Sequence, residues 1–233
     1  MTGRATSTGD GLVPGRPGPA IIAHAAGNTV RSTRVAIADV ADFLEVDLFV
    51  HRGRFEARHE RRMYPLPLLF EKWYVRWAPR SPFSLVDLLR ESAGQVRVFL
   101  DLKNGGSTAA ALVREALDAV PRAALVASSQ HWPILRAVER ACPGIDLFYS
   151  VDVQAKLDLM LSVAGRDLRP RGVSCNHRLL TPARISRLHE AGLQVVGWTV
   201  DDLDRVRELI AWGVDGITTH RVREVREMLQ ERS

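Results

Sequence analysis

The sequence predicts an α/β fold of the (β/α)8 barrel (TIM-barrel) class, and three observations support this prediction. Short apolar runs alternate with segments whose apolar residues recur every three to four positions, as strands and helices do. Eight such strand–helix units fit into the 233 residues, of which 46% are hydrophobic, enough for one packed core. No glycine-rich phosphate loop follows the first apolar run, which disfavours the alternative of an open, doubly wound sheet.

The strands are expected where short apolar runs are bounded by turn or helix signals. These runs cover residues 20–25, 43–50, 96–103, 124–129, 146–151, 172–176, 194–200 and 216–219. The helices are expected between them, and the two clearest helical periodicities lie in residues 109–120 and 222–229. Gly192 and Gly213 precede the last two strands, where the preceding helices are expected to end.

Residues 20–233 are expected to form this single barrel domain, preceded by a disordered leader at residues 1–19. The leader is rich in Gly, Pro, Ser and Thr and lacks the apolar segment of a signal peptide. No apolar run reaches the ~18 residues of a membrane-spanning helix. The two cysteines lack metal-binding spacing, which favours a reducing, cytoplasmic location.

The charge distribution limits the classes of partner. The formal net charge of +5 comes from arginines that are spread along the chain, so it only weakly favours anionic partners such as phosphate or a membrane surface. The aromatic–basic pattern of a nucleic-acid-binding module is absent from the sequence, and no nucleic-acid partner is expected. The oligomeric state is left open.

One part of the chain departs from the strand–helix alternation. Residues 54–60 are predicted to form an extra short strand, and residues 61–83 a long loop rich in proline, aromatic and basic residues. Loops of this length often carry function. The loop contains Tyr64, Lys72, Trp73, Tyr74, Arg76, Trp77 and Arg80. This mixture suits peripheral contact with a membrane or a lipid headgroup, and it fits equally well a loop that folds over the barrel rim with its aromatic rings buried.

Two carboxylates lie two positions apart in the second predicted strand. Alternation places Glu45 and Asp47 on one face of the strand and Leu44, Val46 and Leu48 on the other. Adjacent acids on an inward face repel each other and lose solvation, so they do not persist as a bare pair. A divalent cation most often stabilises such an arrangement, and the pair therefore predicts a metal site.

Further polar residues lie at the ends of the predicted strands, where barrel active sites are built. They are His24, His59, Asp101, Lys103, Trp198 and Thr199. Each alone has an ordinary structural interpretation, such as a hydrogen-bonding histidine, a salt bridge or a packed tryptophan. Together they are expected to converge on one face of the barrel with Glu45 and Asp47.

A series of motifs appears in a fixed order along roughly residues 20–232. The motifs are IIAH at 21–24, NT at 28–29, DFLEVD at 42–47, His59, LDLK at 100–103, RLLTP at 178–182, AGLQVVGWTVDD at 191–202 and GVDGITT at 213–219. This ordered set resembles the glycerophosphodiester phosphodiesterase family. The resemblance implies a TIM barrel of the phospholipase C-like (PLC-like) phosphodiesterase type.

The resemblance also implies a site and a reaction. One divalent ion, Mg²⁺ or Ca²⁺, would be held by Glu45, Asp47 and Asp101, and His24 and His59 would form the acid–base pair. The substrate would be a glycerophosphodiester or a lysophospholipid. A hard cation neutralises the phosphate, and two imidazoles can exchange protons with the nucleophile and the leaving oxygen. Lys103 would hold the phosphate as a point charge, and Trp198 would line the pocket.

The chain departs from the family pattern at four positions. The usual His-Arg-Gly is His24 followed by Ala25, the usual glutamate before Asn-Thr is Gly27, the third metal ligand is aspartate instead of glutamate, and the usual aspartate after the last strand is His220. The related sphingomyelinase D-like branch also lacks the arginine and uses an aspartate ligand, but this chain lacks the disulfide pattern of that branch. Arg61 or Arg62 would have to reach the phosphate to replace the arginine, although a solvated pair is the simpler interpretation.

These departures leave two alternatives to an active phosphodiesterase. The first is a pseudoenzyme that binds a phospho-ligand or an anionic membrane surface without turnover. The second is a barrel enzyme of another class, in which Lys103 forms a Schiff base. Both histidines and all three carboxylate positions persist, which favours retained phosphodiesterase activity.

Overall fold

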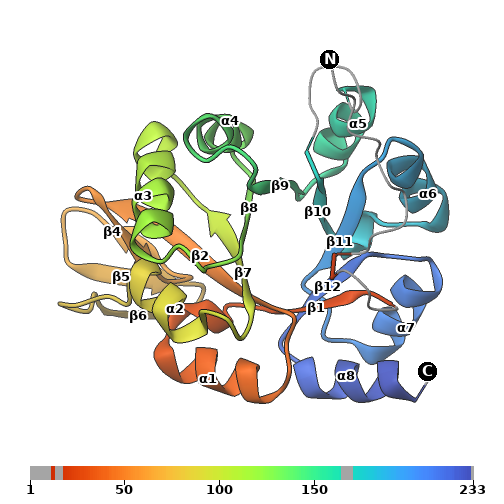
Figure 1. The fold of residues 1–233 in the computed structure, drawn as a ribbon, viewed down its shortest axis with the longest axis horizontal. Coiled ribbons are helices and arrows are strands. Elements are labelled where there is room, and N and C mark those ends of the chain that lie inside the picture. The colour runs from red at the N-terminus through yellow and green to blue at the C-terminus, as the bar shows by residue number, and fades with distance from the viewer. Residues whose placement is uncertain (1–11, 14–17, 164–169, 232–233) are drawn as a thin grey trace.

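The computed structural model describes residues 12–13, 18–163 and 170–231, and in these residues eight parallel strands close into a barrel with helices around it (Figure 1). The barrel strands are β1 (Ala20–Ala23), β2 (Phe43–His51), β7 (Arg97–Leu102), β8 (Leu125–Ser129), β9 (Asp146–Val151), β10 (Gly172–Asn176), β11 (Gln194–Trp198) and β12 (Gly216–Thr219). They pair in the order β1-β12-β11-β10-β9-β8-β7-β2, and β1 also pairs with β2, which closes the ring. The predicted (β/α)8 barrel is confirmed, with strand bounds close to those expected.

The helices follow the barrel strands and pack outside the ring. They are α1 (Val30–Ala38), α2 (Leu85–Ser92), α3 (Gly106–Ala119), α4 (Trp132–Ala141), α5 (Gln154–Val163), α6 (Pro182–Glu190), α7 (Leu203–Ala211) and α8 (Val222–Gln230). The two clearest predicted periodicities coincide with α3 and α8. Gly192 and Gly213 have φ of +75° and +85° just after α6 and α7, a backbone region that glycine adopts readily at a helix end.

The barrel interior is apolar at its N-terminal end and polar at its C-terminal end. The apolar layer consists of Ala20, Ile22, Phe43, Phe99, Val126, Phe148 and Val196, together with Leu12 from outside the strands. Because side chains alternate along a strand, Glu45 and Asp47 share the inward face with Phe43, and Asp101 shares it with Phe99. The outward residues Leu44, Val46 and Leu48 belong to the core between strands and helices. The predicted alternation in β2 is therefore confirmed.

The N-terminal mouth of the barrel is covered by a residue from the predicted leader. Leu12 is buried there, and Arg97 donates a hydrogen bond of 2.8 Å to its carbonyl oxygen. Residues 1–11 and 14–17, which make up most of the leader, lie outside the described residues, so the expectation of disorder for 1–19 stays a prediction.

Residues 61–83 contain a small sheet, which corrects the prediction of a long loop. The predicted extra strand is present as β3 (Arg54–Ala57), which is shorter than the predicted 54–60 and pairs antiparallel with β2. β4 (Arg61–Met63), β5 (Leu68–Glu71) and β6 (Tyr74–Trp77) then form a separate three-stranded antiparallel sheet at one edge of the molecule (Figure 1). Each strand has only three or four residues, and prolines interrupt the segment between and after them, so their alternation did not stand out from a loop pattern.

Among the described residues, none of the helices has the length and apolar composition needed to cross a membrane.

Candidate active site

The C-terminal end of the barrel contains a pocket with a volume of about 600 Å³. Six of the seven predicted site residues line it, namely His24, Glu45, His59, Asp101, Lys103 and Trp198. The seventh, Asp47, is fully buried beside them. The structure therefore brings together all the residues that the sequence indicated.

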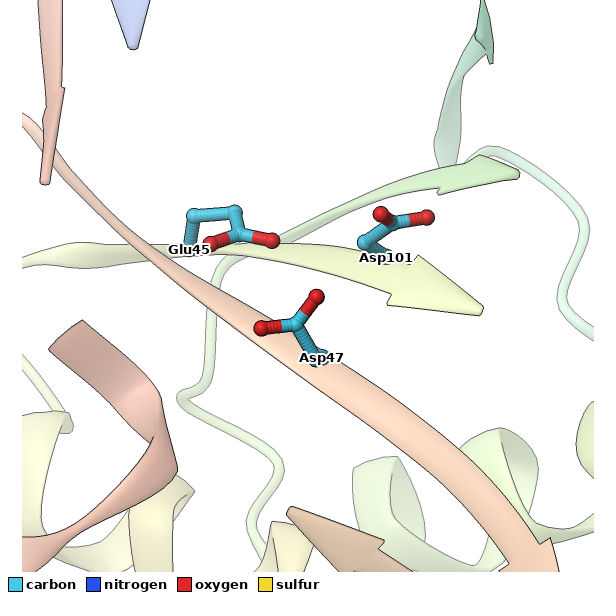
Figure 2. Close-up of side chains that lie close together, drawn as sticks. All are labelled: Glu45, Asp47 and Asp101. Atoms are coloured by element: carbon cyan, nitrogen blue, oxygen red, sulfur yellow. The ribbon is translucent and has the colours of Figure 1, made fainter. Parts of the chain in front are cut away.

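Three carboxylates meet because of the strand register. Asp47 of β2 lies opposite Asp101 of β7 in the parallel pairing, and Glu45 is one inward position before Asp47. Oxygen atoms of the three side chains all lie within 4.8 Å of one another. Figure 2 shows Glu45, Asp47 and Asp101 turned toward one another. Burial and the neighbouring charges of Glu45 and Asp47 raise the pKa of Asp101 to about 6, although Lys103 opposes this shift.

Lys103 supplies the positive charge that this cluster needs within the protein. Its Nζ is 2.7 Å from Oδ1 of Asp47 and also bonds Oδ2 of Asp101. Burial alone would lower the pKa of the Lys103 ammonium, but Asp101, Asp47 and Glu45 outweigh burial and raise it. A lysine held as a paired ammonium is a poor nucleophile, so the geometry does not favour the Schiff-base alternative.

The carboxylate oxygens of this cluster could serve as ligands for a cation. Oδ1 of Asp101 is buried and accepts no hydrogen bond, although a buried carboxylate oxygen normally has a partner. Oδ1 of Asp47 is also buried, and its contact is the ion pair with Lys103. Carboxylate oxygens are the ligands that Mg²⁺ and Ca²⁺ prefer. The residues present therefore fit a divalent cation.

The loop after β1 donates hydrogen bonds to two of these carboxylates. The Ala25 backbone N–H donates to Oε2 of Glu45 at 2.6 Å, and Asn28 Nδ2 donates to Oδ2 of Asp47 at 2.8 Å. The Asp47 backbone N–H in turn donates to Oδ1 of Asn28 at 2.9 Å. The sequence showed Asn28 only as part of a motif, and its role as a support of Asp47 emerges from the fold.

Gly27 allows this loop to lie directly on β2. A Cβ atom at position 27 would be 2.7 Å from Cβ of Val46 and 3.1 Å from the carbonyl oxygen of Glu45. The backbone approach thus excludes the glutamate that the family pattern has at this position, because any side chain there would displace the strand that bears the carboxylates.

Three histidines surround the pocket, and each is bound through Nδ1 to a carboxylate. His24 is 3.2 Å from Glu45, His59 is 2.7 Å from Glu71, and His220 is 2.8 Å from Asp201. The ring of His24 lies edge-on to both others, with centroid distances of 5.9 Å to His59 and 4.7 Å to His220. A carboxylate at Nδ1 orients an imidazole and leaves Nε2 free for a ligand.

The electrostatic surroundings of His24 favour its protonated form. Burial lowers the pKa of His24, but the hydrogen bond and the charge of Glu45, together with Asp47, outweigh burial and raise it. His220 is held further by its backbone N–H, which donates to Oδ1 of Asp201 at 2.9 Å.

Sequence reasoning missed Glu71 and the role of Asp201. Asp201 lies in the quoted motif at 191–202, which was the available signal. For Glu71 the sequence offered no signal, because this residue lies in the segment that was predicted to be a loop. Arg61 and Arg62 do not line the pocket, and Arg62 instead pairs with Glu56 at 3.0 Å.

Fold and site together define an α/β-barrel protein whose C-terminal pocket combines a carboxylate cluster with carboxylate-held histidines. A profile of the Glycerophosphoryl diester phosphodiesterase family matches residues 89–224, which is more than half of the chain. The chain belongs to this family. The match covers Asp101, Lys103, Trp198 and His220, and it begins after the first half of the site.

A curated relative from Mycobacterium tuberculosis, "Probable glycerophosphodiester phosphodiesterase 2", is 45% identical over 51 residues. This alignment spans 22% of the present chain and 19% of that protein, so it covers only about a fifth of the relative's length.

Solved structures show the same fold at low identity. A glycerophosphodiester phosphodiesterase from Parabacteroides distasonis is 20% identical, with a TM-score of 0.75 over 94% of this chain and 99% of that one. A phosphodiesterase from Oleispira antarctica, in complex with the product sn-glycerol-3-phosphate, is 16% identical, with a TM-score of 0.75 over 91% of this chain and 97% of that one.

Proposed function

We propose that this protein is a phosphoric diester hydrolase that cleaves glycerophosphodiesters or lysophospholipids. The proposal rests on one observation: a carboxylate cluster in which a buried oxygen of Asp101 accepts no hydrogen bond faces the same pocket as His24 and His59. Family membership and the product-bound barrel from Oleispira antarctica support the substrate class. The glycerol phosphate moiety is the part shared by both candidate substrates.

Glu45, Asp47 and Asp101 would hold one divalent cation, Mg²⁺ or Ca²⁺. When bound, such a cation neutralises phosphate charge and stabilises the developing charge on the leaving oxygen. The ammonium of Lys103, now bonded to Asp47 and Asp101, provides part of this counter-charge within the chain and lines the pocket beside the phosphate position.

His24 and His59 would carry the protons. Glu45 and Glu71 hold their Nδ1 atoms, so Nε2 of each ring is the atom available to a substrate. One imidazole takes the proton of the attacking hydroxyl or water, and the other gives a proton to the leaving oxygen. Such paired general acid–base catalysis accelerates a reaction typically by 10²–10⁴ per group.

His220 would take over part of the phosphate contact that an arginine makes elsewhere in the family. Its ring is beside His24 and its Nδ1 is fixed by Asp201, while position 25 holds an alanine with no side chain to offer. Trp198, which lines the same pocket, contributes its ring to the wall and its unpartnered Nε1–H as a donor.

The experiment is a turnover assay of purified protein after treatment with a chelator. Glycerophosphocholine, glycerophosphoethanolamine and lysophosphatidylcholine are offered with Mg²⁺, Ca²⁺ or Mn²⁺, and products are measured as released choline, ethanolamine or glycerol phosphate. We expect metal-dependent turnover that falls at least a hundredfold in His24→Ala and in His59→Ala. Turnover that is absent, or equal to that of the two variants, contradicts the proposal.

A pseudoenzyme is the second candidate, favoured by Ala25 and by the closeness of Gly27 to β2, which removes two side chains of the family pattern. It predicts that glycerol phosphate raises the melting temperature equally in the wild type and in His59→Ala, without turnover of any substrate. Measurable hydrolysis by the wild type excludes it.

A further inference from the structure

The three-stranded sheet β4–β6 has two faces of opposite character, and the polar face is directed at the barrel. Directly paired residues of antiparallel strands share a face. One set consists of Arg62, Leu69 and Arg76, followed by the pair Glu71 and Tyr74. Leu69 is fully buried. Arg62 pairs with Glu56, Arg76 and Tyr74 bind Glu60, and Glu71 binds His59, and all three of these partners lie in the segment just before β4. The polar interactions of the sheet are thus made inward.

The other face of the sheet is apolar and faces solvent. We call it the outward face, and it consists of Met63, Leu68, Phe70, Val75 and Trp77, with Arg61 at its edge. Trp77 is 72% exposed, Val75 is 56% exposed, and Trp73 at the β5–β6 turn is 96% exposed. An amphipathic sheet with its apolar side in water is the reverse of the usual arrangement, and a contiguous exposed apolar patch marks an interaction surface.

Basic residues are frequent in the segment that forms the outward face. Residues 61–83 contain five Lys or Arg residues and one Glu. Arg62 and Arg76 are paired with Glu56 and Glu60 on the inward face. Arg61, Lys72 and Arg80 are exposed, and none of them has an ion-pair partner in the part of the chain that the structure describes. Exposed apolar and indole side chains in a segment with unpaired cations complement a membrane interface with anionic headgroups.

The same hairpin reaches the active-site pocket. Glu71 and Lys72 line the pocket, and Glu71 holds His59. Trp73 is the next residue after Lys72 and lies at the tip of the turn. A lipid surface bound at the outward face would therefore lie beside the pocket opening, where a headgroup can enter.

We propose that the outward face of β4–β6 docks the protein on an anionic lipid bilayer and presents headgroups of single-chain phospholipids to the pocket. The proposal rests on the proposed phosphodiesterase function for its substrate, and on the outward face alone for the docking. It selects lysophospholipids over water-soluble glycerophosphodiesters as the substrates whose turnover depends on this surface.

A second copy of the chain is a weaker candidate for the occupant. Two outward faces brought together would bury Arg61 of each copy without an acidic partner from the face, and they would add the unpaired Lys72 and Arg80 of both copies to the same assembly. Like charges in an interface are repulsive. Anionic headgroups, by contrast, neutralise the same cations.

The docking is tested with the full chain by flotation with vesicles of phosphatidylcholine, with and without about one third phosphatidylglycerol. The test variant combines Trp73→Ser, Val75→Thr and Trp77→Thr, and the charge variant combines Arg61→Glu and Arg80→Glu. The control combines Val35→Ser on α1 with Leu159→Ser on α5, which are exposed apolar residues on other elements. Circular dichroism verifies that each variant is folded.

We expect the wild type and the control to float with the anionic vesicles, and the test and charge variants to lose at least tenfold in affinity. Turnover of lysophosphatidylcholine in vesicles should fall in the test variant, while turnover of glycerophosphocholine should not. A wild type that fails to float, or a test variant that floats equally well, overturns the proposal. Concentration-dependent dimerisation that the test variant abolishes, without vesicle binding, also overturns it.

Failure of the docking and failure of the enzymatic function give different results. Flotation needs no turnover, so the His24→Ala and His59→Ala variants should bind vesicles as the wild type does. Vesicle binding without hydrolysis of any substrate contradicts the phosphodiesterase function and supports the docking. Hydrolysis without vesicle binding supports the phosphodiesterase function and contradicts the docking.

Discussion

Asp47 of β2 and Asp101 of β7 occupy directly paired positions on neighbouring strands, and Oδ1 of Asp101 is buried there and accepts no hydrogen bond. The register of the two strands thus creates a pair of acids that the chain itself does not fully satisfy. Lys103, two positions after Asp101 on the same strand side, bonds both and keeps the cluster compact.

We expect a divalent cation to stabilise the fold. At a free concentration about a hundredfold above Kd, Mg²⁺ or Ca²⁺ should add about 2.7 kcal/mol to the free energy of unfolding and raise Tm by roughly 5–10 °C. Asp47→Asn should remove most of this shift, because a neutral amide is a weaker ligand for a hard cation. Differential scanning fluorimetry after chelator treatment measures it. Asp146→Asn, at the far end of β9, is the matched control, and an equal shift in both variants contradicts the assignment.

Glu71→Gln should lower kcat for a soluble glycerophosphodiester by about a hundredfold and change KM little, because the loss of a positioned group acts on the chemical step. Glu71 contacts His59 and not the carboxylate cluster, so metal-induced stabilisation should be unchanged. Steady-state kinetics measure kcat and KM separately and so test this prediction. Glu91→Gln, a half-buried acid on α2 paired with Arg34 and remote from the pocket lining, provides the control. If KM rises and kcat stays constant, Glu71 binds substrate instead of positioning His59.

His220→Asp should raise KM for an anionic diester by about tenfold, because it places a second carboxylate beside Asp201 and repels phosphate. His220→Gln, which keeps a hydrogen-bond donor and adds no carboxylate, should show a smaller increase. Both are measured under the same metal loading. A KM unaffected by either change would show that His220 does not face the phosphate.

Glu56→Gln should destabilise the protein by about 3 kcal/mol at neutral pH, because it leaves the buried Arg58 and the half-buried Arg62 without their anion. Glu56 is 3% exposed and binds Arg58 and Arg62, each at 3.0 Å. Burial raises the pKa of Glu56, but the hydrogen bonds and charges of the two arginines outweigh burial and lower it below 4.5.

The sign of the pH dependence follows from this lowered pKa. The carboxylate contributes its stability in full above the unfolded value near 4.5, and the contribution is lost as pH falls through the lower folded value. Denaturant unfolding of the wild type and of Glu56→Gln should therefore differ most at pH 6–7 and converge under acid. A difference that grows toward low pH would contradict the role of the Glu56 charge.

Much of this protein could be predicted from local sequence patterns. The period-two alternation in β2 predicted which side chains point into the barrel, and the helical periodicities predicted α3 and α8, because both depend only on backbone geometry within one element. The site residues could be predicted because parallel strands of a barrel end at one face, so polar residues at strand ends converge.

The small sheet β4–β6 was not predicted, because its strands are too short for a period to emerge and its stability depends on contacts with the barrel. For the same reason Glu71 could not be assigned to His59. The partners of Lys103 and the support of Asp47 by Asn28 likewise depend on how segments far apart in sequence pack together.

The sequence by itself determined the order of strands and helices, which follows from patterns within a few residues. Its ordered motifs along residues 20–232 also singled out three carboxylates and two histidines as candidate site residues. Tertiary structure alone decided the register that joins Asp47 to Asp101, the acids that hold each histidine, and the direction in which the apolar side of β4–β6 faces. The physical reason is that charge pairing, burial and surface exposure are properties of distances between segments, and those distances exist only once the barrel has closed.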